Sequence, residues 1–323
     1  MEGLFEHFRF ARFEFLLKAT DEIHLPTYKG STFRGAFGHT FKKIVCINRE
    51  KDCNGCLLKN RCIYSYVFET PPPPDTEKMK KYPYAPHPFV ITPPLETTRT
   101  YKEGEGLKFE LTLIGKAIDY LPYFIYTFDE LGKKGIGKGQ GTFQLEKVKA
   151  VGGAETEEEG STVYSSVDKA LRCDFKVLDG RALAPLDLDV PTLTLQFLTP
   201  TRLKFDGALT LKLEFHILVR NLLRRISLLS YFHCGEELVV DFKGLIEKSK
   251  EVRIQKETLR WVDWERYSNR QETRMKMGGF IGPITFMGDF KPYAPFLLLG
   301  EQIHVGKGTS FGLGKFKISK QGS

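Results

Sequence analysis

Two segments of the sequence place glycines and lysines close together. Residues 135–148 read GIGKGQGTFQLEKV, and residues 305–318 read VGKGTSFGLGKFKI. Glycine lets the backbone reach positive φ angles and approach a ligand closely, so the N–H groups of such a loop can hold a phosphate beside the lysine charges. The candidate phosphate-binding residues are Lys138, Gly306, Lys307, Gly308, Gly312, Gly314 and Lys315. Neither segment has Walker A spacing, and glycines required only for turn geometry are the alternative.

The side chains best suited to acid–base chemistry are histidines, because imidazole gains and loses a proton near neutral pH. Of the seven histidines, His39 has Lys42 and Lys43 one helical turn later and Tyr28 before it. His304 directly precedes the second glycine segment. The alternatives are a surface or half-buried helix position for His39 and a helix C-terminus for His304, where the helix dipole favours positive charge.

Four cysteines follow the pattern C-x6-C-x2-C-x5-C, which is typical of metal ligands. They are Cys46, Cys53, Cys56 and Cys62. Four thiolates match a closed tetrahedral zinc site, which leaves no position for a reacting water. We therefore expect structural zinc and no catalytic metal. An iron–sulfur cluster uses the same ligands, and four reduced thiols in a loop are the third interpretation.

Three arginines recur at every fourth residue, at Arg266, Arg270 and Arg274. On a single strand, residues separated by an even number lie on one face. The three side chains would then form a basic stripe that pairs with nucleic-acid phosphates. A solvated strand face is the alternative.

Composition and charge limit the class of protein. The chain of 323 residues is 41% hydrophobic and 27% charged, which is typical of a globular protein with two domains. Its net charge of +8 favours a polyanionic partner such as nucleic acid. The sequence has no long apolar run, and its beginning, MEGLFEHFRFARFEF, lacks the apolar core of a secretory signal. We therefore expect a cytoplasmic protein with no membrane partner.

The elements that must position these residues repeat in two halves. In the first half, alternation and helical spacing predict strands at 8–19, 64–70, 87–93, 106–115 and 143–151, and helices at 31–45 and 117–133. In the second half they predict a strand at 192–204, a helix at 209–232, a hairpin within 264–288 turned at Gly278–Gly279, and a helix at 293–305 before the glycine segment and its strand.

Both halves have the order of the ferredoxin-like βαββαβ unit. We predict an α+β fold with two tandem ferredoxin-like domains, at 1–151 and 191–323, joined by a linker region at 152–190. A cysteine-rich insertion at 46–62 interrupts the first domain. The Pro-rich segment 71–88 receives no predicted role.

The sequence resembles the RAMP superfamily of CRISPR-associated proteins and, within it, the endoribonucleases that process precursor CRISPR RNA. The resemblance covers most of the chain. It is carried by YKGSTFRGAFGHTFKKIVC (28–46), WERYSNRQ (264–271), GGFIGPITF (278–286) and HVGKGTSFGLGKF (304–316). The glycine segment that closes the chain is the most specific of these motifs.

The resemblance implies an endoribonuclease that cuts precursor CRISPR RNA within its repeats by attack of a 2′-hydroxyl, without metal, to give mature crRNA. His39 would then be the acid or base, with Tyr28, Lys42 and Lys43 near it and His304 as a second candidate. A non-catalytic RAMP subunit that binds crRNA in a CRISPR effector complex is the alternative. A zinc-stabilised nucleic-acid module unrelated to CRISPR is a third interpretation. We expect a monomer or a homodimer.

Overall fold

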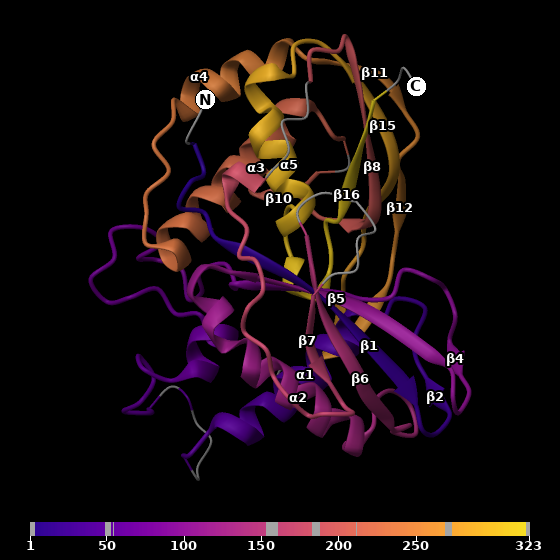
Figure 1. The fold of residues 1–323 in the computed structure, drawn as a ribbon. Helices are drawn as coiled ribbons and strands as arrows, with labels where there is room; N and C mark the ends of the chain where they lie inside the picture. Colours follow the sequence, from indigo (N-terminus) through magenta and orange to yellow (C-terminus); the bar gives the residue numbers. More distant parts are fainter. Residues whose placement is uncertain are drawn as a thin grey trace. The chain divides into compact units, whose positions relative to one another are not determined.

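The computed structural model describes residues 4–48, 53, 55–152, 161–182, 188–210, 212–268 and 273–320. The chain divides into two compact units. The N-terminal unit holds residues 7–179 and 228–236, and the C-terminal unit holds residues 1–6, 180–227 and 237–323. Each unit has its own sheet, and most of the strands are labelled in Figure 1.

The sheet of the N-terminal unit is antiparallel and has the strand order β3-β5-β1-β6-β7. Its strands are β1 (Phe10–Ala19), β3 (Phe89–Thr92), β5 (Gly106–Ile114), β6 (Phe143–Val151) and β7 (Thr162–Ser165). A separate pair joins β2 (Ile23–His24) to β4 (Thr100–Tyr101). The alternation of β1 buries Phe13, Phe15 and Leu17 on one face, as period-two spacing requires.

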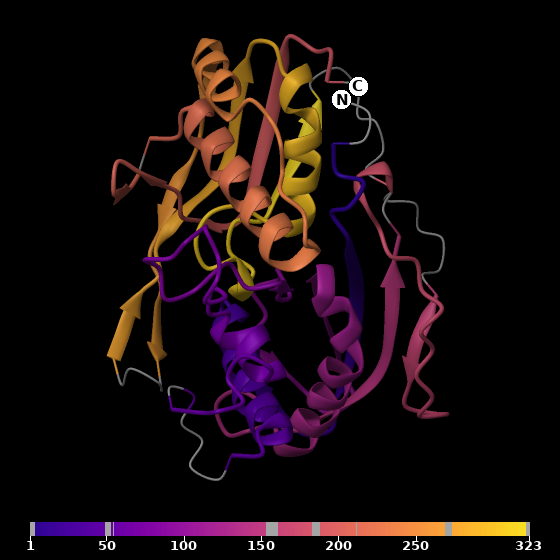
Figure 2. The ribbon, with the colours of Figure 1, turned by 90° about the vertical axis from the view of Figure 1, so that its left-hand side faces the viewer.

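Two helices cover the N-terminal sheet, α1 (Gly30–Val45) and α2 (Leu121–Lys134), with a 3-10 turn at Gly115–Tyr120 leading into α2. They lie side by side on one face of the sheet in Figure 2. Phe33, Phe37 and Phe41 recur at every fourth residue of α1 and are fully buried. Phe37 stacks on Phe124 of α2 with ring centroids 4.8 Å apart. This phenylalanine core fixes the rotation of α1, and with it the side of α1 that faces solvent.

The C-terminal unit repeats the plan with strand order β11-β15-β8-β16. Its strands are β8 (Thr192–Thr201), β11 (Arg253–Glu257), β15 (Gly279–Met287) and β16 (Phe316–Lys320), and β12 (Arg260–Val262) also pairs with β15. Short hairpins join β9 (Lys204–Phe205) to β10 (Ala208–Leu209) and β13 (Glu265–Ser268) to β14 (Thr273–Lys276). The helices are α3 (Phe215–Leu229), α4 (Phe242–Lys248) and α5 (Ala294–Ile303).

The order of elements confirms the predicted pair of ferredoxin-like folds. In each unit the long strand before the first helix is central and pairs with the strand that follows the glycine segment, β6 in the N-terminal unit and β16 in the C-terminal unit. The strands β1 and β8 are therefore equivalent, and so are α1 and α3. The glycine segments lie just before β6 and β16, at equivalent positions of the two units.

Some predicted elements differ from the structure. The segment predicted as a strand at 64–70 contains a π-helix at Ser65–Glu69, because Phe68 packs against α1 instead of pairing in the sheet. The hairpin does not turn at Gly278–Gly279: β14 ends at Lys276 and β15 begins at Gly279. The long helix begins at Phe215 rather than at 209. Part of the predicted linker, Thr162–Ser165, adds β7 to the N-terminal sheet.

No helix within the described ranges combines the length and the apolar character needed to cross a membrane.

Candidate functional site

The helix α1 exposes a narrow stripe on the side opposite its phenylalanines. Gly35, His39 and Lys43 are exposed, and they recur at every fourth residue. Residues at this spacing are neighbours on one helix face. The imidazole of His39 is therefore presented to solvent with an ammonium group one turn further along, which is an arrangement suited to acid–base chemistry on an anionic substrate.

Tyr28 and Lys42 lie away from this stripe. Burial raises the pKa of Tyr28 well above its usual value, so the hydroxyl stays neutral. Tyr28 precedes the first turn of α1, and His39 lies nine residues after Gly30, about 14 Å along the axis at 1.5 Å per residue. The ammonium of Lys42 lies 5.0 Å from the ring centroid of Tyr64 and faces the cysteine-rich insertion. Tyr28 is thus distant from His39 along the helix, whereas Lys42 is a helical neighbour of His39 whose ammonium is directed toward Tyr64.

His304 is buried, with 1% of its surface exposed. Its Nδ1 lies 3.2 Å from the carbonyl of Leu313, and its backbone takes a positive φ of 62° where α5 ends. The guanidinium of Arg225 donates to the carbonyls of Ile303 and His304 at 2.8–3.1 Å. Burial lowers the pKa of Arg225 to about 9. The surroundings of His304 thus indicate a structural role at the end of α5.

The two glycine segments have equivalent backbone contacts. The N–H of Lys138 donates to the carbonyl of His24 at 3.0 Å, and the N–H of Lys307 donates to the carbonyl of Arg202 at 2.9 Å. A Cβ on Gly137 would lie 2.1 Å from the His24 carbonyl oxygen, and one on Gly306 would lie 2.4 Å from that of Arg202. In both units glycine thus lets the segment lie against the chain that follows the central strand, and both lysines are exposed.

The charges around these two lysines differ. In the C-terminal unit, burial lowers the pKa of Lys307, and the positive charges of Lys204, Arg202 and Arg224 lower it further. We call these four residues the basic cluster. In the N-terminal unit, His24 instead pairs with Glu22 at 2.9 Å. The basic cluster concentrates positive charge, which favours binding of a phosphate.

The rest of the second glycine segment is held by β8. Thr199 donates its hydroxyl to the carbonyl of Gly312 and accepts the N–H of Lys315, at 2.8 and 2.9 Å. A Cβ on Gly314 would clash with the backbone of Val305. Gly308, Gly312 and Gly314 all have positive φ. These glycines are required by the turns of the segment, and the turns and hydrogen bonds hold the backbone near Lys307 in place.

The predicted stripe of arginines on a single strand is wrong. Arg266 lies on β13 opposite Met275, whereas Arg274 lies on β14 opposite Tyr267. Arg270 lies outside the described residues. The hairpin places Arg266 and Arg274 on two neighbouring strands, and RNA binding by these arginines stays a prediction.

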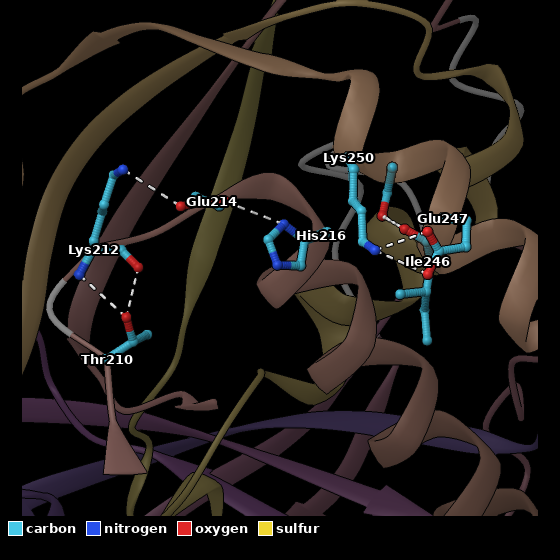
Figure 3. Close-up of polar contacts among 8 residues, drawn as sticks. Thr210, Lys212, Glu214, His216, Ile246, Glu247 and Lys250 are labelled. Atoms are coloured by element: carbon cyan, nitrogen blue, oxygen red, sulfur yellow. Dashed lines mark hydrogen bonds and ion pairs between the residues drawn. The ribbon is translucent and has the colours of Figure 1, made fainter. Parts of the chain in front are cut away.

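The remaining histidines form local contacts. Figure 3 shows His216 directed toward Glu214, with Nδ1 3.4 Å from the carboxylate, while Lys212 approaches the same carboxylate. Lys250 pairs with Glu247 in the same view. His233 is buried and contacts the carbonyl of Pro86 at 2.7 Å. These contacts give His216 and His233 structural roles.

The four cysteines of the insertion are free thiols, each half-buried. Burial raises the pKa of the Cys53 thiol, and Lys42 opposes that shift. Among the residues that the structure describes, no group of three or more His, Cys, Asp or Glu side chains is arranged to hold a metal. Zinc binding by the four cysteines stays a prediction from their sequence spacing.

Sequence reasoning identified Lys307 but missed the other three residues of the basic cluster. Arg202 and Lys204 follow β8, Arg224 lies on α3, and Lys307 lies in the glycine segment. Besides Lys307, the sequence signal was TRLKF at 201–205, which places two cations at the end of the predicted strand 192–204.

Two family models match the chain. The model AF_1859_N, described as an N-terminal domain, matches residues 8–174. The model of the CRISPR-associated endoribonuclease Cas6 matches residues 195–316, which contain the basic cluster and the second glycine segment. Residues 195–316 therefore match the Cas6 family of CRISPR-associated endoribonucleases. This confirms the predicted family and excludes a nucleic-acid module unrelated to CRISPR.

Similar proteins cover nearly the whole of this chain. An uncharacterized protein of Archaeoglobus fulgidus is 26% identical over 305 residues, which are 92% of this chain and 93% of that protein. A Cas6 product complex has a TM-score of 0.57 at 15% identity and covers 96% of this chain and 100% of its own. Cas6 of Thermus thermophilus has a TM-score of 0.53 at 14% identity, covering 97% and 99%.

A Cas6-RT-Cas1–Cas2 complex also has the fold of this chain, with a TM-score of 0.57 at 13% identity. The match covers 97% of this chain and 46% of the other, so this chain spans about half the length of that chain. At these identities the solved structures establish the fold.

Proposed function

We propose that this chain cuts precursor CRISPR RNA within its repeats by attack of a 2′-hydroxyl, without metal, and that His39 is its acid or base. The observation that carries the proposal is the exposed position of His39 on α1, one turn from Lys43, in a chain with a Cas6 domain.

The reaction needs proton transfer at two oxygens. The 2′-oxygen loses its proton and bonds to phosphorus, while the 5′-oxygen leaves with a proton, so the products are a 2′,3′-cyclic phosphate and a 5′-hydroxyl. Imidazole can remove the first proton or supply the second. The ammonium of Lys43 stabilises the negative charge that develops on the phosphoryl oxygens. No step in this scheme calls for a metal ion.

The substrate class follows from charge. The basic cluster is suited to backbone phosphates, because four cationic side chains gathered on one unit release counterions when a polyanion binds. We propose repeat RNA as the substrate, with Lys307 as a phosphate contact. The N-terminal glycine segment lacks this charge, and we assign Lys138 no contact with phosphate.

The test is cleavage of labelled repeat RNA in EDTA by the full chain and by His39→Ala. We expect the wild type to cut at one position and His39→Ala to cut at least about 100-fold more slowly, because proton-transfer catalysis contributes on that order. RNA affinity should change little. His24→Ala is the matched control, since His24 is also exposed but pairs with Glu22.

Three results contradict parts of the proposal. Cleavage that stops in EDTA and returns with a divalent metal would exclude the metal-free scheme. Equal rates for His39→Ala and wild type would exclude His39. Tight, site-specific binding with no cleavage by the wild type would instead identify a crRNA-binding subunit.

A further inference from the structure

Gly35 occupies an interior position of α1 where the fold does not require glycine. A Cβ there would meet no described atom within 4 Å, and its φ is not in the left-handed region. Gly38 in the same helix differs, because a Cβ would lie 2.5 Å from the ring of Phe68. Packing explains Gly38 but not Gly35. Since glycine destabilises a helix relative to alanine, Gly35 lowers stability without a packing benefit among the described residues.

The position of Gly35 relates directly to His39. The two residues are four apart and both exposed, so they are neighbours on one face of α1. Side chains of a helix lean toward its N-terminus and cover the turn before their own Cα. We therefore expect the imidazole of His39 to lean toward the turn that contains Gly35, where a Cβ would meet no described atom within 4 Å.

That space has the properties needed at a reacting phosphodiester. A general acid or base must come within hydrogen-bond reach of the oxygen that it serves. A substrate backbone can approach a helix most closely where the helix carries no Cβ. Lys43 provides positive charge on the same face, one turn beyond His39.

We propose that Gly35 is a positioning residue, which opens a gap beside His39 for the ribose–phosphate backbone of the RNA at the cut. The proposal rests on the proposed function and adds a steric requirement to it. A side chain at residue 35 keeps the 2′-hydroxyl or the 5′-oxygen out of reach of the imidazole. The fold itself tolerates that side chain, because its place is open.

The experiment compares Gly35→Ala and Gly35→Leu with the wild type in the full chain. Single-turnover cleavage of repeat RNA, RNA affinity and the thermal unfolding midpoint are measured for each. Gly152→Leu is the control, because Gly152 is also exposed, has no positive φ and has no described atom within 4 Å of a Cβ.

We expect opposite changes in stability and activity. Gly35→Ala should raise the unfolding midpoint by about 2 °C, in accordance with helix propensity, yet slow cleavage about 10-fold. Gly35→Leu should slow cleavage about 100-fold at saturating enzyme without lowering the midpoint by more than about 2 °C, since small displacements of reacting groups cost rates of that order. Gly152→Leu should cut as the wild type does.

Cleavage by Gly35→Leu at the wild-type rate would overturn the inference and leave the nuclease intact. A fall in the midpoint that parallels the loss of activity would also overturn it, because that result indicates a structural role. Should the wild type bind repeat RNA without cutting it, the proposed function fails separately. In that case, unchanged RNA affinity of Gly35→Leu would overturn the proposal that Gly35 makes room for RNA. Weakened affinity would support a contact between the RNA backbone and α1 at Gly35.

Discussion

At the scale of single residues, Lys138 and Lys307 occupy equivalent positions in the two glycine segments and can be compared directly. The N–H groups of Lys138 and Lys307 donate to equivalent carbonyls in the two units. Only Lys307 has Arg202, Lys204 and Arg224 around it. Gene duplication would account for the shared frame, whereas the difference in charge indicates that the two loops no longer share a ligand.

This difference predicts unequal effects of the same substitution. Lys307→Ala should weaken binding of repeat RNA about 5- to 10-fold at moderate salt and reduce the slope of log affinity against log salt by about 0.7, the value for one single-strand phosphate contact. Lys138→Ala should change affinity less than about twofold. Fluorescence anisotropy titrations at several salt concentrations measure both. Equal losses of RNA affinity in the two variants would show that the charges around Lys307 do not decide which of the two loops binds RNA.

The histidines show how far sequence can identify catalytic residues. The exposure of His39 could be predicted, because phenylalanines at positions 33, 37 and 41 define the buried face of α1 and leave residue 39 on the other side. The burial of His304 could not, because it depends on Arg225, which lies 79 residues away in the sequence. A histidine beside a glycine loop looks the same in sequence whether it faces solvent or the core.

At the scale of elements, Arg225 of α3 holds the end of α5 in place. The last carbonyls of a helix lack partners within the helix, and a cation at that end both satisfies them and interacts favourably with the dipole. Arg225 does this for Ile303 and His304, directly before the second glycine segment. The position of Lys307 therefore depends on a buried charge in a neighbouring helix.

Replacing Arg225 should consequently destabilise the chain. Arg225→Met leaves two buried carbonyls without these donors, and we expect a loss of about 2–4 kcal/mol, measured by denaturant unfolding. Arg225→Lys should give an intermediate loss, because an ammonium cannot reproduce the fork of the guanidinium. The adjacent, exposed Arg224 is the control: Arg224→Met should leave stability nearly unchanged and weaken RNA binding. Similar stability for all three variants would show that Arg225 does not hold α5.

The elements that could be predicted are those with strong periodicity. The alternation of β1 and the spacing of α1 are apparent in the sequence because one face of each is apolar. The segment 64–70 also alternates, with aromatic residues at Tyr64, Tyr66 and Phe68, yet it contains a π-helix. Its aromatic residues pack on α1 and on one another, so tertiary contacts determine the local structure. The basic cluster joins three separate segments, and no local pattern indicates such a cluster.

At the scale of the whole molecule, the two units share a strand order but differ in what interrupts it. The N-terminal unit carries the cysteine-rich insertion between α1 and the π-helix, whereas the C-terminal unit carries α4 after its first helix. The insertion presents Ile47 and Leu57 to solvent, with 81% and 101% of their surfaces exposed. Exposed apolar side chains contribute little to folding, so a cross-link of another kind would be needed to fix this segment.

Zinc is the cross-link that the cysteine spacing predicts. We propose that Cys46, Cys53, Cys56 and Cys62 close around one zinc ion. Chain purified without an affinity tag should then contain about one zinc per molecule by mass spectrometry, and Cys53→Ser/Cys56→Ser should contain none.

Because metal binding to the folded chain adds to its stability, EDTA should lower the unfolding midpoint of the wild type and leave that of the double variant unchanged. Cleavage per folded molecule should be equal in both, since a closed four-thiolate site has no open coordination position. Absence of zinc from the wild type, with equal midpoints in and out of EDTA, would instead establish four reduced thiols.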